Sequence, residues 1–221
     1  MGEQSLIAVI GDLIDSKNIE NRFVVQERLK EILEEVNRYY REYIVSKWTI
    51  TLGDEFQVLM RPNLKLFEML DLISYKMRPN KIRYGIGLGD IKTSINYEES
   101  IGADGPAYWN ARKAIESIHD NNNYGNSKTA FISGSSNDEI INNLLAYTDW
   151  MEERWTDSQR EVLYYLIDNN MYGEKFEQKK VAKALNISQS AMSRRVKSSG
   201  IKLYLSSRNS ISKQIKNMGG F

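Results

Sequence analysis

Hydrophobic residues along most of the chain alternate between strand-like and helix-like spacing. Short apolar runs bounded by turn residues are typical of strands, and apolar positions that recur every three or four residues are typical of amphipathic helices. Strands are predicted at Leu6–Ile10, Trp48–Leu52, Phe56–Met60, Ile82–Leu88, Ile91–Asn96 and Ala130–Ser133. Helices are predicted at Val25–Tyr40, Phe67–Met77, Pro106–His119 and Asp138–Trp150. The leading order β-α-β-β-α-β predicts an α+β fold with a ferredoxin-like sheet.

Charge is divided unevenly along the 221 residues. The whole chain has 30 Lys+Arg and 29 Asp+Glu, a net of only +1. Residues 1–151 hold 17 basic and 22 acidic residues, a net of −5, whereas residues 152–221 hold 13 and 7, a net of +6. Thr156 and Gln159 have the spacing of a capping box that opens a new helix. We therefore predict an α+β domain over residues 1–151 and a small helical or winged domain over residues 152–221.

Composition excludes several kinds of chemistry. Because the chain has no cysteine, it forms no disulfide, iron–sulfur cluster or cysteine zinc site. The single histidine, His119, argues against a Ser-His-Asp triad and is expected at the surface near a helix C-terminus. A bound metal would need oxygen ligands, as Mg²⁺, Mn²⁺ and Ca²⁺ do. No apolar run is long enough to span a bilayer and no signal-peptide pattern is present, so we expect a cytoplasmic protein without a membrane partner.

The segment from Lys180 to Lys197 has the pattern of a helix-turn-helix. Asn186 stands at the turn, where a left-handed backbone is required, and Ser188 is placed to cap the second helix. The positions expected to be buried are Val181, Ala182, Leu185, Ile187, Met192 and Val196. The positions expected to face DNA are Gln189, Ser190, Ser193, Arg194 and Lys197. Such side chains suit base edges and phosphates in a major groove.

The surroundings of this segment are strongly basic. Residues 174–216 contain 11 basic and 2 acidic residues, a net of +9, which is typical of nucleic-acid binding. The alternative is a helical hairpin that serves dimerisation and exposes a solvated basic face. DNA binding is the better prediction, and a homodimer is expected because operators usually present two half-sites.

Two Gly-Asp steps indicate a possible metal site in the acidic part. Asp12 follows the first predicted strand, and Asp54 lies at the tip of the predicted hairpin. In a split sheet these strands are neighbours, so the two carboxylates could converge on Mg²⁺ together with phosphate oxygens. The alternative is that Gly-Asp only forms a turn or caps a helix.

Four segments together resemble the SatD family. They are residues 9–17, 50–57, 83–90 and 101–108, read as VIGDLIDSK, ITLGDEFQ, RYGIGLGD and IGADGPAY. The same segments are similar to class III nucleotidyl cyclase and GGDEF-type domains. That resemblance implies metal ligation by Asp12, Asp54 and Glu55, with Mg²⁺ or Mn²⁺ as cofactor. It also implies a nucleotide ligand, with Leu13, Ser16, Lys17, Gly53 and Asp104 as candidate contacts.

The chain departs from the cyclase pattern in ways that bear on catalysis. Ile50 stands where cyclases carry a base-reading lysine, and Leu52 replaces the first glycine of the GGDEF motif. Cyclases carry an Asn and an Arg four residues apart on a late helix. Here Asn110 and Arg112 are only two residues apart, so on a helix they face different ways. If the domain is an enzyme, Arg112 or Lys113 would balance the charge of the transition state.

Three functions therefore remain open. The first is a nucleotide-responsive DNA-binding regulator. The second is an active nucleotidyl transferase or cyclase that uses two metals at Asp12 and Asp54. The third is a DNA-binding protein whose α+β domain only dimerises.

Overall fold

The computed structural model describes residues 5–121 and 125–220. Within them, five strands form one sheet in the order β2-β3-β1-β4-β5. The strands are β1 (Leu6–Leu13), β2 (Ile44–Leu52), β3 (Glu55–Met60), β4 (Ile82–Gly89) and β5 (Thr129–Ile132). β1 runs antiparallel to β3 and β4, and β5 runs parallel to β4. The predicted α+β class is confirmed.

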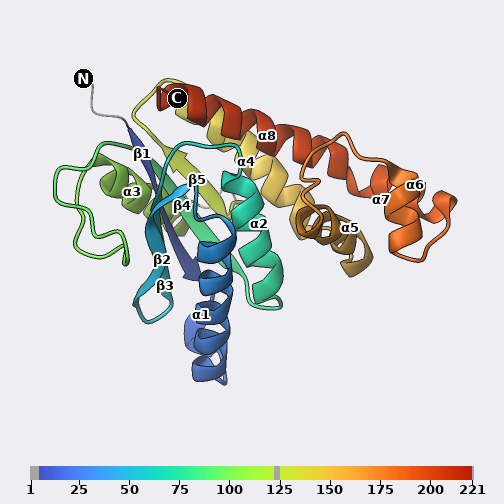
Figure 1. Ribbon diagram of the computed structural model, residues 1–221, viewed down its shortest axis with the longest axis horizontal. Coiled ribbons are helices and arrows are strands. Elements are labelled where there is room, and N and C mark those ends of the chain that lie inside the picture. The colour runs from blue at the N-terminus through green and yellow to red at the C-terminus, as the bar shows by residue number, and fades with distance from the viewer. Residues whose placement is uncertain (1–4, 122–124, 221) are drawn as a thin grey trace.

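Helices cover both faces of the sheet (Figure 1). They are α1 (Arg22–Tyr39), α2 (Leu66–Met77), α3 (Pro106–Asn121), α4 (Asp138–Glu153), α5 (Asp157–Asp168), α6 (Gln178–Ala184), α7 (Gln189–Ser199) and α8 (Ile201–Met218). Alternate residues of β1 point to opposite faces, as its pleat requires. Val9 joins the core beneath α1 and α2, whereas Ile10 packs with Ala111 and Ile115 of α3.

The predicted strand at Ile91–Asn96 is wrong. Residues 90–105 form an irregular segment that leads into α3. Both edges of β4 are already paired, one with β1 and the other with β5, so a returning strand has no place beside it. The segment instead passes near β2, where Ser46 Oγ donates to Asn96 O at 2.5 Å.

The glycines of β4 serve helix packing. A Cβ at Gly85 would lie 2.3 Å from Ala111 O, and a Cβ at Gly87 would lie 2.1 Å from Ala107 O. Both oxygens belong to the backbone of α3, so neither can move aside alone. Because these strand positions have no side chain, α3 can pack directly against β4.

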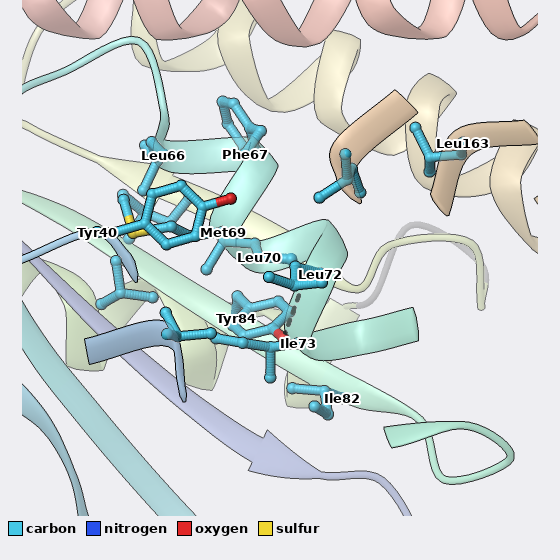
Figure 2. Close-up of a cluster of buried hydrophobic side chains, with 14 of the residues drawn as sticks. Tyr40, Leu66, Phe67, Met69, Leu70, Leu72, Ile73, Ile82, Tyr84 and Leu163 are labelled. Carbon is cyan, nitrogen blue, oxygen red and sulfur yellow. Dashed lines mark hydrogen bonds between the residues drawn. The ribbon is translucent and has the colours of Figure 1, made fainter. Parts of the chain in front are cut away.

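The predicted basic domain shares one core with the α+β part. Ile201, Ile211 and Ile215 of α8 belong to the same buried cluster as Val9 and Phe67. Figure 2 shows the centre of that cluster, where α2 lies over Tyr84 and Ile82 of β4 and Leu163 of α5 approaches it. The 151/152 boundary falls inside the last turn of α4, so it is not a linker.

The C-terminal segment is all-helical rather than winged in the part of the chain that the structure describes. α8 runs from the end of α7 back across the α+β part to the C-terminus (Figure 1). The capping box at the start of α5 is confirmed, with Thr156 N donating to Gln159 Oε1 at 2.8 Å. Over the described residues, none of the helices is both long and apolar enough to cross a membrane.

Candidate functional site

Asp12 lies at the end of β1 on the face that α3 covers, directly opposite Arg83 of β4. Arg83 Nε donates to Asp12 Oδ1 at 2.9 Å and Nη2 to Oδ2 at 3.2 Å. His119 of α3 completes the group, since its Nε2 is 3.1 Å from Asp12 Oδ2 and its Nδ1 is 2.9 Å from Arg83 Nη1. A neutral ring protonated on Nε2 satisfies both contacts. His119 is thus a surface residue, as expected, but with a specific role in this group.

Glu55 is the first residue of β3 and is held by Arg112 of α3. Arg112 Nη1 and Nη2 contact the two carboxylate oxygens, the second at 2.8 Å. Thr51 Oγ1 also donates to Glu55 Oε1 at 3.2 Å. The hydrogen bond to Glu55 raises the pKa of Arg112 above its ordinary value, as expected for a guanidinium group paired with a carboxylate.

The predicted metal ligands do not fit a divalent cation as they are folded. Asp12 and Glu55 project toward α3 from neighbouring strands, but each carboxylate already accepts three hydrogen bonds, two of them from a guanidinium group. A cation there would have to displace an arginine. No group of three or more acidic or histidine side chains with metal-binding geometry occurs within residues 5–121 and 125–220.

Asp54 lies apart from this pair, in a cavity on the α1 side of the hairpin. The cavity has a volume of about 240 Å³. Of the residues that the resemblance implies, it is lined by Leu13, Ser16, Gly53 and Asp54. α1 contributes Arg22 and Gln26, and Gln26 Nε2 donates to Gly53 O at 2.5 Å. Three predicted nucleotide contacts and one predicted metal ligand are therefore brought together, and the lining side chains include one cation, Arg22, and one anion, Asp54.

The remaining predicted residues lie elsewhere. Lys17 is exposed and does not line the cavity. Asp104 lies in the irregular segment before α3, where it accepts from Trp109 Nε1 at 2.6 Å. Asn110 bonds to Leu88 O at 2.9 Å and so holds α3 to β4, while Lys113 is exposed on α3. The structure thus separates Asn110 from Arg112, as their spacing predicted.

Arg83 was missed by sequence reasoning although a signal existed. Arg83, Gly85, Gly87 and Gly89 alternate along β4, so they share the face that α3 covers. Arg83 is the only one of these four residues that is not glycine, so its side chain is well placed to pair with an acid on the adjacent strand. Which acid it meets depends on the register between β1 and β4, which the sequence does not give.

The α6–α7 unit, residues 178–199, has the local geometry that the sequence predicts. Asn186 has a φ of 52°, the left-handed conformation expected at the turn. Ser188 Oγ accepts from Ala191 N at 3.1 Å and caps α7. Met192 is fully buried and Val196 nearly so, while Leu185 and Ile187 are partly buried.

The outward face of α7 is also as expected. Gln189, Ser190, Ser193, Arg194 and Lys197 are all exposed. Arg195, the neighbour that faces inward, is instead bound to Glu161 of α5 at 3.0 Å. α7 thus presents uniformly polar side chains, two of them cationic, on the side away from its core contacts.

These features describe an α+β protein with a five-stranded sheet and an attached helical segment. The chain belongs to the SatD family, whose family model matches residues 6–215. The structure of a bacterial light-regulated adenylyl cyclase is similar with a TM-score of 0.44 and 14% sequence identity, over 59% of this chain and 77% of that one. No curated protein matches the chain.

Proposed function

We propose that this protein is a DNA-binding regulator that reads DNA with α7. The observation that carries the proposal is the two-sided character of that helix. Its inner side buries Met192 and Val196, while its outer side exposes only polar and basic residues. A capped helix with this division, in a segment of net charge +9, suits the major groove and its phosphates.

In this proposal the α+β domain carries the α6–α7 unit and senses a ligand. The cavity lined by Ser16, Gly53 and Asp54 is our candidate place for a nucleotide, and the likeness of residues 9–17 and 50–57 to cyclase-type segments supports it. An active two-metal cyclase is the weaker candidate. Of its two predicted ligands, Asp12 is paired with Arg83 and Asp54 lines the cavity beside α1, and Arg112 is occupied by Glu55.

Selection of binding sites from a random duplex library tests the DNA proposal. We expect the full chain to enrich a defined motif and to bind it far more tightly than unrelated duplex, by about 10³-fold or more. Binding should weaken steeply with salt because phosphate contacts release counterions. Failure to enrich any motif, together with no measurable binding at low salt, would contradict the proposal.

The homodimer expected from half-site geometry has a candidate interface on α4. Ile140, Leu144, Tyr147 and Trp150 form an exposed apolar stripe along this helix, with exposures of 66, 40, 69 and 42%. Such stripes on soluble proteins commonly mark interfaces. Glu139 lies at one end of the stripe, and Arg154 at the other stacks 4.0 Å from the Trp150 ring. In an antiparallel pair of α4 helices, the acidic end of each helix would lie against the basic end of the other. We therefore propose that the stripe binds a second copy of this chain.

Replacing Tyr147 with glutamate should convert the dimer to a monomer, because a like charge would then face its own copy at the centre of the stripe. Sedimentation velocity on the full chain without DNA measures this. The matched control is Phe23→Glu on α1, which changes a side chain of similar exposure, 72%, far along the chain from α4. A wild-type monomer, or a Tyr147→Glu variant that remains dimeric, would refute the interface.

A further inference from the structure

The cavity beside α1 is lined by polar side chains that have no partner. Asp54 is partly exposed and Arg22 is exposed, and neither side chain makes an ion pair or a hydrogen bond within the part of the chain that the structure describes. The hydroxyl of Ser16 is likewise free there. By contrast, Asp12 and Glu55 each pair with an arginine. The carboxylate of Asp54 is therefore accessible and available to a ligand.

The rest of the cavity wall is mainly apolar. Four aliphatic side chains contribute to it, two buried in the main core and two partly buried against that core: Leu13, Leu29, Ile19 and Val25. The hydrogen bond from Gln26 Nε2 to Gly53 O ties α1 to the hairpin tip and so holds the two sides together. An aliphatic wall beside a free carboxylate suits a flat, uncharged ring that has N–H groups on one edge.

The size of the cavity limits how much of a nucleotide it can enclose. Its volume of about 240 Å³ is less than the roughly 300–1,000 Å³ of pockets that bury a drug-sized ligand. A base can therefore enter, while the ribose and phosphates remain outside. Arg22 Nη2 lies 3.9 Å from the position that a Cβ would take at Gly53, so this exposed cation reaches the hairpin tip. A phosphate that leaves the cavity on this side would meet Arg22.

The chemistry of Asp54 discriminates between bases. An ionised carboxylate only accepts hydrogen bonds. Guanine presents two neighbouring donors, N1–H and the 2-amino group, which one carboxylate can accept together. Adenine presents one amino group beside the acceptor N1, so a carboxylate there would face a second acceptor. Among purines, Asp54 therefore favours guanine.

We propose that this cavity binds the base of a guanine nucleotide, with Asp54 accepting from N1–H and the 2-amino group. Arg22 contacts the phosphates outside. The inference rests on the proposed nucleotide-sensing role and identifies the nucleotide by its base. It makes Asp54 a base-recognition residue instead of a metal ligand, so binding requires no divalent cation.

Isothermal titration calorimetry on the full chain, in buffer that contains EDTA, tests the base assignment. We expect guanosine 5′-monophosphate (GMP) to bind about tenfold or more tighter than adenosine 5′-monophosphate (AMP). Inosine 5′-monophosphate lacks the 2-amino group but keeps N1–H. It should bind about tenfold more weakly than GMP, because one hydrogen bond to the carboxylate is lost.

Asp54→Asn tests the residue itself. An asparagine amide offers one acceptor and one donor, which is the pattern that adenine matches. The preference for GMP over AMP should therefore fall by about tenfold, whereas damage to the fold would weaken both ligands alike. Asp168→Asn is the matched control, since Asp168 is an exposed aspartate at the end of α5 and does not line the cavity.

Arg22→Ala tests the position of the phosphates. It should weaken GMP and AMP by a similar factor, about threefold or more, and leave the affinity for guanosine unchanged, because guanosine has no phosphate. Arg28→Ala is the control, since Arg28 is exposed on the same helix and does not line the cavity.

The outcomes separate this inference from the proposed function. Equal affinities for GMP and AMP, or a GMP preference that Asp54→Asn leaves intact, would refute the base assignment and keep the nucleotide site. Binding that appears only when Mg²⁺ replaces EDTA would overturn the inference in favour of Asp54 as a metal ligand. No binding of any of these nucleotides, with or without Mg²⁺, would refute the nucleotide-sensing role and this inference with it. Binding of DNA by α7 is measured without nucleotide and is decided separately.

Discussion

Replacing Arg208 with methionine is expected to lower the free energy of unfolding by about 3–5 kcal/mol, because it leaves the carboxylate of Asp149 buried without its charged partner. The two side chains are 4% and 5% exposed and meet at 2.5 Å. Asp149 also holds the start of β5 through Lys128 N and Thr129 N. The loss should therefore appear in one cooperative transition for both parts of the chain, measured by urea unfolding with circular dichroism.

Lys213→Met is the control for this substitution, since Lys213 is on the same helix and exposed. It should change the free energy of unfolding by less than about 0.5 kcal/mol. The double variant with Asp149→Asn should lose less than the sum of the two single variants, because the paired charges are removed together. A loss below about 1 kcal/mol for Arg208→Met would show that the ion pair does not hold the two parts together.

Replacing Gly87 with alanine is expected to cost about 3 kcal/mol or more, because a Cβ at that position would overlap the backbone of α3. The added carbon would lie 2.1 Å from Ala107 O and 2.2 Å from Ala111 N. α3 must shift away from β4 to relieve the overlap, and its contacts at Asp12 and Glu55 shift with it. Thermal and urea unfolding measure the cost.

Gly173→Ala is the matched control. Its Cβ would meet only Asn209 Nδ2, at an ordinary 3.7 Å, and the change should stay within about 1 kcal/mol. If Gly87→Ala were as stable as Gly173→Ala, the close approach of α3 to β4 would be wrong.

Local signals explain most of what could be predicted from the sequence. The cap of α7 depends on Ser188 and a backbone amide three residues away, and the turn depends on Asn186 alone. The capping box at Thr156 is equally local. Such interactions are set by neighbours in the chain, so spacing is enough to find them.

The failures concern contacts between distant residues. The partner of Asp12 is Arg83, 71 positions away, and the pairing depends on the register of two strands. The two Gly-Asp steps predicted that Asp12 and Asp54 converge, but spacing could not show that Asp12 pairs with Arg83 or that Asp54 lines a cavity beside α1. The net charge of +9 over residues 174–216 also overstates the charge at the surface, because it includes Arg208, which is buried against Asp149.

The central claim is that α7 binds DNA, and fluorescence anisotropy of a labelled duplex, titrated over a range of NaCl concentrations, tests it most directly. The variant Arg194→Ala/Lys197→Ala removes both exposed cations of the outer face of α7. The control Lys30→Ala/Lys213→Ala removes two exposed cations from α1 and α8. If both α7 cations contact phosphates, the slope of log affinity against log salt should be smaller in magnitude by about 2 in the α7 variant. The control should keep the wild-type slope. Equal loss of affinity and slope in the two variants, or no binding by the wild type, would contradict the account.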